Sequence, residues 1–189
     1  MKHKYAASYS FLQLRPLQKE DLESLRCWRN NAETSAYLRK MDYITQEKQV
    51  LWYKNYLTLP NFYFWSILKN KTLLGALSIY NVSGNQAEIG KIMIGDESER
   101  GKGYGYTAFV MAMKIGFNLL QLDSYRLFVH ENNSAALRVY TKIGFNIVEK
   151  FNNGELEMVI NKQTYENANP MNNDIIVYLS PSISGIGGG

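Results

Sequence analysis

The chain has 189 residues, of which 46% are hydrophobic and 20% charged, as in one soluble globular domain rather than a disordered or fibrous protein. Its formal net charge of +4 is small, which argues against a dedicated nucleic-acid binder but suits an anionic small ligand. No stretch approaches the roughly 20 apolar residues of a membrane span, and the N-terminal residues lack the apolar run of a secretory signal.

The single cysteine, Cys27, cannot form an internal disulfide or build a zinc site. This cysteine usage suits a reducing compartment, so we expect a cytoplasmic location. Nothing beside Cys27 suggests a nucleophile, and we expect it to be a buried small hydrophobic residue. No group of His, Asp and Glu has the spacing of metal ligands, so no bound metal is expected.

The first sixty residues predict one strand followed by two helices. Residues 9–17 alternate in character up to a proline, which is typical of a strand. Residues 18–31 place apolar side chains at helical spacing behind an acidic first turn. Residues 44–57 predict a second helix, which starts at Thr45 and has its apolar positions at Val50, Tyr53 and Leu57.

The period then changes from helical to strand-like. Residues 62–95 predict three strands joined by two hairpin turns. A strand over 124–130, a short helix over 133–143 and a hairpin over 145–161 come later in the chain. Between these two groups, beyond a glycine-rich stretch, one face of a further helix is formed by Tyr106, Phe109, Val110, Met113, Phe117 and Leu120.

This order of elements predicts a mixed α/β fold with one domain over residues 1–162. The pattern loosens in residues 163–189, which contain asparagine and glycine clusters and one short apolar run. We expect this C-terminal extension to form a last helix and strand or to be partly disordered.

Three glycines at alternate positions, Gly101, Gly103 and Gly105, stand where the third of these strands turns into the next helix. A helix N-terminus presents unclaimed backbone amides and the positive end of the helix dipole, and glycines let an anion reach them. A tight turn that needs glycine dihedrals is the alternative. The spacing excludes a Walker A loop, which needs Gly-Lys-Ser/Thr, and a dinucleotide fingerprint, which needs GxGxxG.

Two motifs together resemble the Gcn5-related N-acetyltransferase (GNAT) superfamily over roughly residues 10–160. "RGKGYG" (100–105) matches the family signature of Arg or Gln, two residues, Gly, one residue, then Gly or Ala. Further on, "NNSAALRVYTKIGF" (132–145) supplies an Asn, a small residue and a Tyr ahead of Gly-Phe. The resemblance implies a single GNAT-like domain, with a central mixed, mostly antiparallel sheet, flanking helices and two splayed strands that hold acetyl-CoA.

The resemblance also implies acyl transfer from acetyl-CoA, the co-substrate, to a primary amine that attacks directly. The freed backbone of one splayed strand, at Ile92, Met93 and Ile94, would pair with the pantetheine arm and the acetyl oxygen. Asn133 has two roles that can coexist, as a helix cap and as a ligand to the pantetheine or phosphate. The pyrophosphate would be bound by the glycine loop, here Arg100, Gly101, Lys102, Gly103, Tyr104 and Gly105.

Tyr140 stands at the family's general-acid position beside the cofactor and would protonate the leaving thiolate, because a phenol stays protonated at neutral pH. Simple packing at helical spacing is the alternative for this side chain. Glu88 matches a position where some members carry a catalytic Glu, and it would accept the amine proton directly or through a water. An exposed strand residue is the alternative for Glu88. His130 is the second candidate base, and Asp96 and Glu97 are expected to be solvated turn residues.

Trp28, Arg29 and Asn30 are expected to line the acceptor side, since the first helices form that wall in the family, although Trp28 could equally belong to the core. The chain resembles two branches, the ribosomal-protein N-terminal acetyltransferases and the amino-sugar-nucleotide acetyltransferases of surface-glycan synthesis. The aromatic stretch over 52–65 favours a small-molecule amine on a nucleotide-linked sugar, with a protein N-terminus as the alternative acceptor. A non-catalytic CoA-binding domain is the second alternative. No nucleic-acid or membrane partner is expected, and a homodimer is left open.

Overall fold

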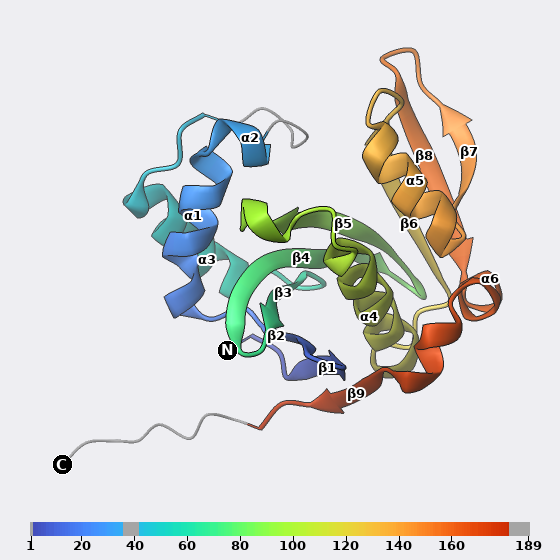
Figure 1. Cartoon of the computed structure of the whole chain (residues 1–189), viewed down its shortest axis with the longest axis horizontal. Coiled ribbons are helices and arrows are strands. Elements are labelled where there is room, and N and C mark those ends of the chain that lie inside the picture. Colours follow the sequence, from blue (N-terminus) through green and yellow to red (C-terminus); the bar gives the residue numbers. More distant parts are fainter. Residues whose placement is uncertain (1, 36–41, 182–189) are drawn as a thin grey trace.

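The computed structural model describes residues 2–35 and 42–181. Within these residues nine strands form one sheet, in the order β7-β8-β6-β5-β4-β3-β2-β1-β9 (Figure 1). The strands are β1 (Tyr5–Tyr9), β2 (Leu12–Pro16), β3 (Tyr63–Lys69), β4 (Thr72–Ser83), β5 (Gln86–Ile94), β6 (Ser124–His130), β7 (Asn146–Lys150), β8 (Glu155–Asn161) and β9 (Ile176–Leu179). The helices are α1 (Leu22–Asn30), α2 (Ala32–Ser35), α3 (Gln46–Thr58), α4 (Tyr104–Leu119), α5 (Ser134–Ile143) and α6 (Lys162–Ala168). This mixed α/β arrangement confirms the expected fold class.

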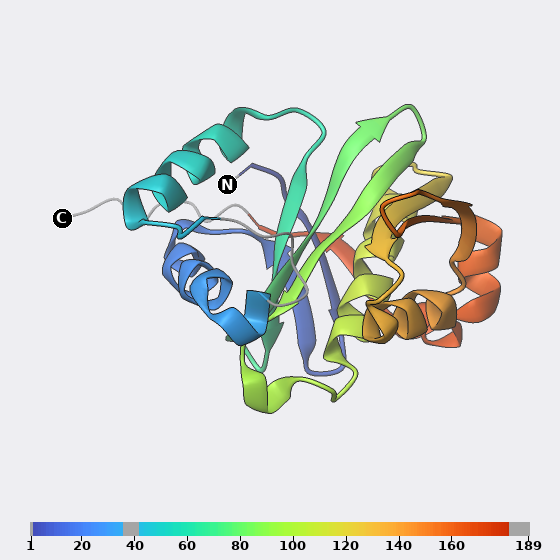
Figure 2. The same ribbon diagram turned by 90° about the horizontal axis from the view of Figure 1, so that it is seen from above.

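Helices cover both faces of the sheet (Figure 2). α1 and α3 lie on one face over one hydrophobic cluster, and α4, α5 and α6 lie on the other face over a second cluster. Phe64 and Trp65 are neighbours in β3 but belong to opposite clusters, because successive side chains of a strand point to opposite faces. In the described part of the chain no helix is long and apolar enough to cross a membrane.

The N-terminal strand differs from the sequence prediction in extent. One strand is expected over residues 9–17, whereas the structure has an antiparallel hairpin, β1 and β2, which turns at Ser10 with a φ of 52°. Ala6 and Ala7 of β1 are fully buried, and β1 packs against α4. The turn contains no glycine, proline or asparagine, so the usual hairpin signals are missing from the sequence.

The C-terminal segment returns to the same edge of the sheet. α6 follows β8 directly, and β9 pairs antiparallel with β1, from Ile176 opposite Ser8 to Leu179 opposite Tyr5. Of the two alternatives expected after residue 162, the last helix and strand are therefore found. Partial disorder at the very end, residues 182–189, concerns positions outside the described residues.

β5 and β6 are parallel neighbours that separate along their length. Their pairing is limited to three residue pairs, the last of which joins Glu88 to Arg126. Beyond it, β5 continues along β4, and β6 continues along β8. We call the region between residues 89–94 of β5 and 127–130 of β6 the fork (Figure 1). The splayed strands expected of the fold are these two.

His3 is a buried histidine close to the N-terminus. It is 8% exposed and packs against the rings of Tyr5, Tyr63 and Trp65. Its Nε2 lies 3.3 Å from the carbonyl oxygen of Phe64. Burial lowers the pKa of His3 to about 4, so the folded protein resists protonation of this ring.

We expect the free energy of unfolding to lose on the order of 3 kcal/mol through His3 as the pH falls from about 6.5 to about 4, because the unfolded chain binds a proton that the folded chain excludes. Above pH 6.5 His3 should have no such effect. Urea denaturation across this range measures the dependence. His3→Phe should show a shallower fall than the unchanged protein, and equal slopes would remove His3 as the cause.

Candidate active site

Gly101 and Gly103 give the loop before α4 a backbone that other residues rarely adopt. Their φ angles are 74° and 84°, both left-handed, and Gly103 is the N-cap of α4. A Cβ on either glycine would meet no described atom within 4 Å, so the approach to the loop is open. The first bond after the cap runs from the Thr107 amide to the Gly103 carbonyl, 3.0 Å, which leaves the amides of residues 104–106 without an acceptor in the helix. The loop therefore combines a tight turn with accessible donors.

Gly105 serves a different purpose. It does not need a positive φ, and a Cβ there would lie 3.8 Å from Cδ1 of Ile92 and 3.9 Å from Cγ1 of Ile94, in ordinary van der Waals contact. The first turn of α4 therefore packs directly on the end of β5, with room for a methyl group.

Charged side chains brace the loop from within. Arg100 donates from Nε to a carbonyl at the end of β5, 3.1 Å, and from Nη2 to Oγ1 of Thr34 in α2, 2.6 Å. Glu99 receives Lys69 from the end of β3 at 2.9 Å and Lys102 at 3.2 Å. The two cations predicted at the loop, Arg100 and Lys102, are thus engaged with protein groups, and these contacts hold the loop in position.

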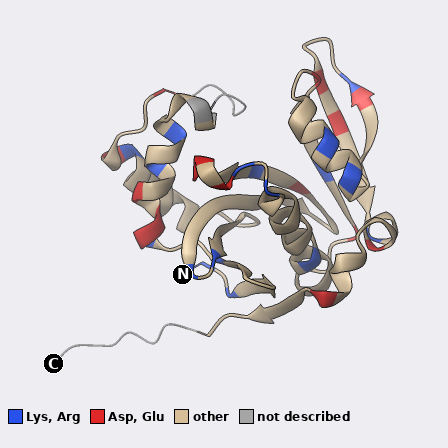
Figure 3. Cartoon of the chain, viewed as in Figure 1, with Lys and Arg blue, Asp and Glu red and all other residues tan. Residues whose placement is uncertain are grey.

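A groove of about 320 Å³ opens beside the loop, between the N-terminus of α4 and one face of α5. It is lined by Gly103, Tyr106, Ala135, Arg138, Val139 and Lys142. The Lys142 ammonium lies 4.7 Å from the centroid of the Tyr106 ring, and basic residues form bands on α5 (Figure 3). The sequence analysis missed Arg138 and Lys142 as candidate ligands. Their four-residue spacing, which places both on one helix face, is the signal that could have found them.

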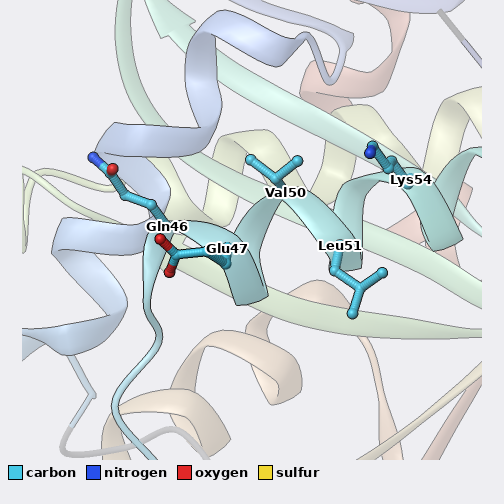
Figure 4. Close-up of a pocket in the computed structure, with 5 residues that line it drawn as sticks. All are labelled: Gln46, Glu47, Val50, Leu51 and Lys54. Atoms are coloured by element: carbon cyan, nitrogen blue, oxygen red, sulfur yellow. The ribbon is translucent and has the colours of Figure 1, made fainter.

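A second hollow, of about 400 Å³, lies along α3 (Figure 4). It is lined by Gln46, Glu47, Val50, Leu51 and Lys54. All five residues come from one helix, and none of them is a predicted catalytic or binding residue. We therefore place the candidate site at the loop and the fork.

α5 supplies two of the predicted residues. Oδ1 of Asn133 accepts the Ala136 amide at 3.1 Å, which is the helix cap expected from the sequence. The Tyr140 ring packs on Phe109 of α4, with 5.3 Å between the ring centroids. Burial and, to a lesser degree, Tyr80 of β4 raise the pKa of Tyr140 to about 12. The Tyr140 hydroxyl therefore keeps its proton at neutral pH.

Glu88 is buried, unlike the exposed strand residue that was its alternative. It is 8% exposed, and its Oε1 accepts Arg126 Nη2 at 2.9 Å and Asn81 Nδ2 at 3.0 Å. Because Glu88 and Arg126 form the last pair between β5 and β6, the carboxylate lies at the apex of the fork. The structure thus brings Glu88 to the site and gives it two donors there.

β5 is distorted where it borders the fork. Lys91 has a φ of 51°, and β5 holds one residue more than β4 between Gly90 and Met93, which is a β-bulge. Ile92 and Ile94 pack against the cluster on the α4 side, whereas Met93 is buried in the cluster under α1 and α3. Because the bulge adds one residue to β5, Ile92 and Ile94 face the same cluster as Ile89 does.

The three residues predicted on the acceptor wall have different surroundings. A Cβ added to Gly95 would come within 1.8 Å of the Trp28 ring, so the indole rests directly on the backbone after β5. Arg29 is partly buried, and burial lowers its pKa. Asn30 donates to the Ile44 carbonyl and accepts the Ile44 amide, both at 2.9 Å. Asn30 therefore ties the end of α1 to the start of α3.

The other residues named from the sequence lie at the open end of the fork or outside it. His130 is exposed at the end of β6, where its Nδ1 accepts a backbone amide of the following turn at 3.2 Å. Asp96 and Glu97 are exposed, as expected. The expectation that Cys27 is buried is wrong, because position 27 falls on the outward face of α1 and its side chain is exposed. Among the residues described, no group of three or more His, Cys, Asp or Glu is arranged to hold a metal ion.

The chain is similar in sequence and fold to known proteins. The family model of the acetyltransferase (GNAT) domain matches residues 12–146. The chain is 23% identical over 134 residues to acetyltransferase PseH of Campylobacter jejuni, which covers 71% of this chain and 82% of that protein. It is 29% identical over 161 residues to spermidine N(1)-acetyltransferase of Escherichia coli, and the match covers 83% of this chain and 82% of that protein. A solved structure of spermidine N-acetyltransferase from Vibrio cholerae, in complex with CoA and spermine, has a TM-score of 0.74 at 23% identity over 83% of this chain and 99% of that chain.

Gly103→Ala tests the loop, with Gly105→Ala as the matched control. A Cβ on the left-handed Gly103 costs about 1–2 kcal/mol, so we expect the loop to shift and acetyl-CoA to bind about tenfold more weakly. Gly105→Ala has room for its methyl group and should bind as the unchanged protein does. Calorimetric titration with acetyl-CoA measures both, beside thermal denaturation. Equal affinities for the two variants would show that binding does not need the left-handed turn.

Proposed function

Because this chain belongs to the GNAT acetyltransferase family and is therefore an acetyl-CoA-dependent acyltransferase, we propose that it acetylates an amino group on a nucleotide-linked sugar. The fork supports acetyl-CoA binding, since the unpaired edge of β5 lies close to the glycine-rich N-terminus of α4, and the cation beside the aromatic rings on the other face of β5 carries the choice of acceptor. The family membership also speaks against the alternative of a non-catalytic CoA-binding domain.

The residues at the loop fit acetyl-CoA, which supplies a thioester-bound acetyl group to the acceptor amine. The amides of residues 101–106 would hold the pyrophosphate, and the dipole of the 16-residue α4 favours an anion there. Arg138 and Lys142 line the adjoining groove and would pair with further phosphate oxygens. Because no atom of the described residues stands within 4 Å of where a Cβ on Gly101 or Gly103 would be, a bulky anion can approach the backbone from this part of the chain.

β5 would bind the arm that bears the acetyl group. After Glu88 it pairs with β4 but no longer with β6, so one edge of its backbone is available to a ligand. Ile92 and Ile94 approach Gly105, which places this edge close to the first turn of α4. A backbone amide directed at the acetyl oxygen would stabilise the developing oxyanion by about 2.7–4 kcal/mol.

Two side chains would move the protons. Tyr140 would protonate the leaving thiolate, because its pKa of about 12 keeps the phenol protonated. Glu88 would accept the proton of the acceptor amine, directly or through a water, from its place at the apex of the fork. His130, the second candidate base, stands exposed at the far end of β6.

The charges beside the fork favour an anionic acceptor. The Lys91 ammonium lies over the rings of Phe62 and Tyr80, 4.6 and 4.5 Å from their centroids, and so places a cation on the α1 and α3 side of β5. The acidic residues Asp21 and Glu23 at the start of α1 are each paired with an arginine of this chain. The diphosphate of a nucleotide-linked sugar suits this cation, and its rings suit the aromatic side chains. A polyamine would meet a like charge.

The choice of acceptor is tested by following CoA release with an amino-sugar nucleotide, a peptide with a free N-terminus, and spermidine. The peptide represents the alternative expected from the sequence, and spermidine represents the activity named for two of the similar proteins. We expect kcat/KM to be at least about tenfold higher for the nucleotide sugar, or 1.4 kcal/mol. Lys91→Gln should raise the KM of the nucleotide sugar. Lys54→Gln, on the exposed face of α3, should leave that KM unchanged. A higher kcat/KM for spermidine or the peptide would overturn the proposal.

Tyr140→Phe tests the general acid. Loss of the hydroxyl should lower kcat by about a hundredfold or more, the usual contribution of a positioned acid, with acetyl-CoA affinity nearly unchanged. Tyr106→Phe is the control, because the Tyr106 hydroxyl donates to Asn169 at 2.9 Å and has no part in the proposed proton transfer. Steady-state kinetics and calorimetry measure the two quantities, and an unchanged kcat in Tyr140→Phe would remove the role.

A further inference from the structure

We propose that Arg126 is a positioning residue that, through Glu88, fixes the point at which β5 and β6 separate and thereby shapes the acetyl-CoA site. The inference rests on the proposed function in one respect, namely that the fork binds acetyl-CoA. The contacts that support it are those of Glu88, Arg126 and Asn81, and neither Arg126 nor Asn81 belongs to a motif of the sequence.

One carboxylate oxygen joins three strands at the apex of the fork. Oε1 of Glu88 on β5 accepts Nη2 of Arg126 on β6 at 2.9 Å and Nδ2 of Asn81 on β4 at 3.0 Å. The Glu88 side chain is 10% exposed and that of Arg126 is 39% exposed, so the pair spans the boundary between core and solvent. A charge-assisted bond of this length is a strong one, and the buried carboxylate has little water to replace it.

Both donors are themselves held in place. Asn81 has a left-handed φ of 50° and lies at a second irregularity, where β4 has one residue more than β5. The Arg126 guanidinium lies 5.8 Å from the centroid of the Phe128 ring, two residues along the same face of β6. Glu88 therefore links a bulge in β4 to a stacked arginine in β6.

The apolar residues beyond this pair do not by themselves end the pairing. The next positions, Ile89 and Leu127, are 1% and 2% exposed and belong to one hydrophobic cluster, so their side chains are compatible with a sheet that continues. The bulge at Lys91 comes three residues after Glu88, and β5 stays paired with β4 beyond it as far as Ile94. The Glu88–Arg126 pair is thus the last residue pair of the ladder between β5 and β6. It fixes where the free edge of β5 begins.

The test compares Arg126→Gln with Arg126→Lys, which keeps the charge, and with Lys150→Gln. The control removes a positive charge from the exposed Lys150–Glu131 pair on the same side of the fork. We expect Arg126→Gln to raise the dissociation constant and the KM of acetyl-CoA about tenfold or more, with a smaller change in kcat. Arg126→Lys should recover most of this loss, and Lys150→Gln should match the unchanged protein.

Amide hydrogen exchange of the ligand-free proteins gives a second readout. Exchange in residues 86–94 should be faster in Arg126→Gln at equal global stability, because the last pair between the strands is lost. Asn81→Gly keeps a residue that tolerates the left-handed backbone, removes one donor to Glu88, and should shift acetyl-CoA affinity in the same direction by a smaller factor. This variant decides the matter if Arg126→Gln does not fold.

The outcomes separate this inference from the proposed function. If the unchanged protein binds acetyl-CoA and both Arg126→Gln and Asn81→Gly bind it equally well, the positioning role is wrong and the proposed function stands. A lower melting temperature in the variants with unchanged affinity, KM and exchange in 86–94 would mean a purely structural pair and would also overturn it. If the unchanged protein does not bind acetyl-CoA, the proposed function fails, and with it the role of the fork.

Discussion

A strand in the middle of a sheet normally has its backbone groups paired on both sides, because an unsatisfied buried group costs about 1–3 kcal/mol. β5 keeps both partners only as far as Glu88, opposite Arg126. The two sides of the fork remain one body because they share a core: Ile89 of β5 and Leu127 of β6 are buried in the same cluster as the helix face of α4. The middle of α4 thus lies under the fork, and the N-terminus of α4 presents free amides near the fork. The opening and the anion site depend on this single helix.

A buried ion pair fixes the position of α1 beside that opening. Asp21, which precedes α1, is 4% exposed and accepts Arg15 twice at 2.7 Å and Ser66 at 2.6 Å. Burial by itself would raise the pKa of Asp21, but the hydrogen bonds from Arg15 and Ser66 outweigh burial and lower it. This network attaches the start of α1 to β2 and β3, and so sets where Trp28 meets the end of β5. Buried pairs of this kind define a geometry more than they add net stability.

Strong local patterns in the sequence predict most of the elements, and the errors have physical causes. The strands over 62–95 and the helix after the glycines are found because their periods are clear. The β1–β2 hairpin is missed because its turn lacks glycine, proline and asparagine. In α3 the predicted apolar position Val50 is 39% exposed, whereas Gln49 and Tyr56 are buried. Leu57 is exposed as well, but the third predicted position, Tyr53, packs against the buried cluster. Apolar spacing alone therefore identifies the covered face of that helix only in part, because the sheet it packs on decides which face is covered.

The sequence by itself determined the glycine loop, the cap at Asn133 and the position of Tyr140 on α5, because these depend on dihedral preferences and on spacing within one element. The proposed roles of these residues in binding and catalysis stay predictions. Only the tertiary structure decided that Glu88 is held by Arg126, 38 residues away, that Arg138 and Lys142 face the loop, and that β5 and β6 part after three pairs. Strand register and helix packing bring these groups together, and both are set by contacts between distant parts of the chain, which no local pattern encodes.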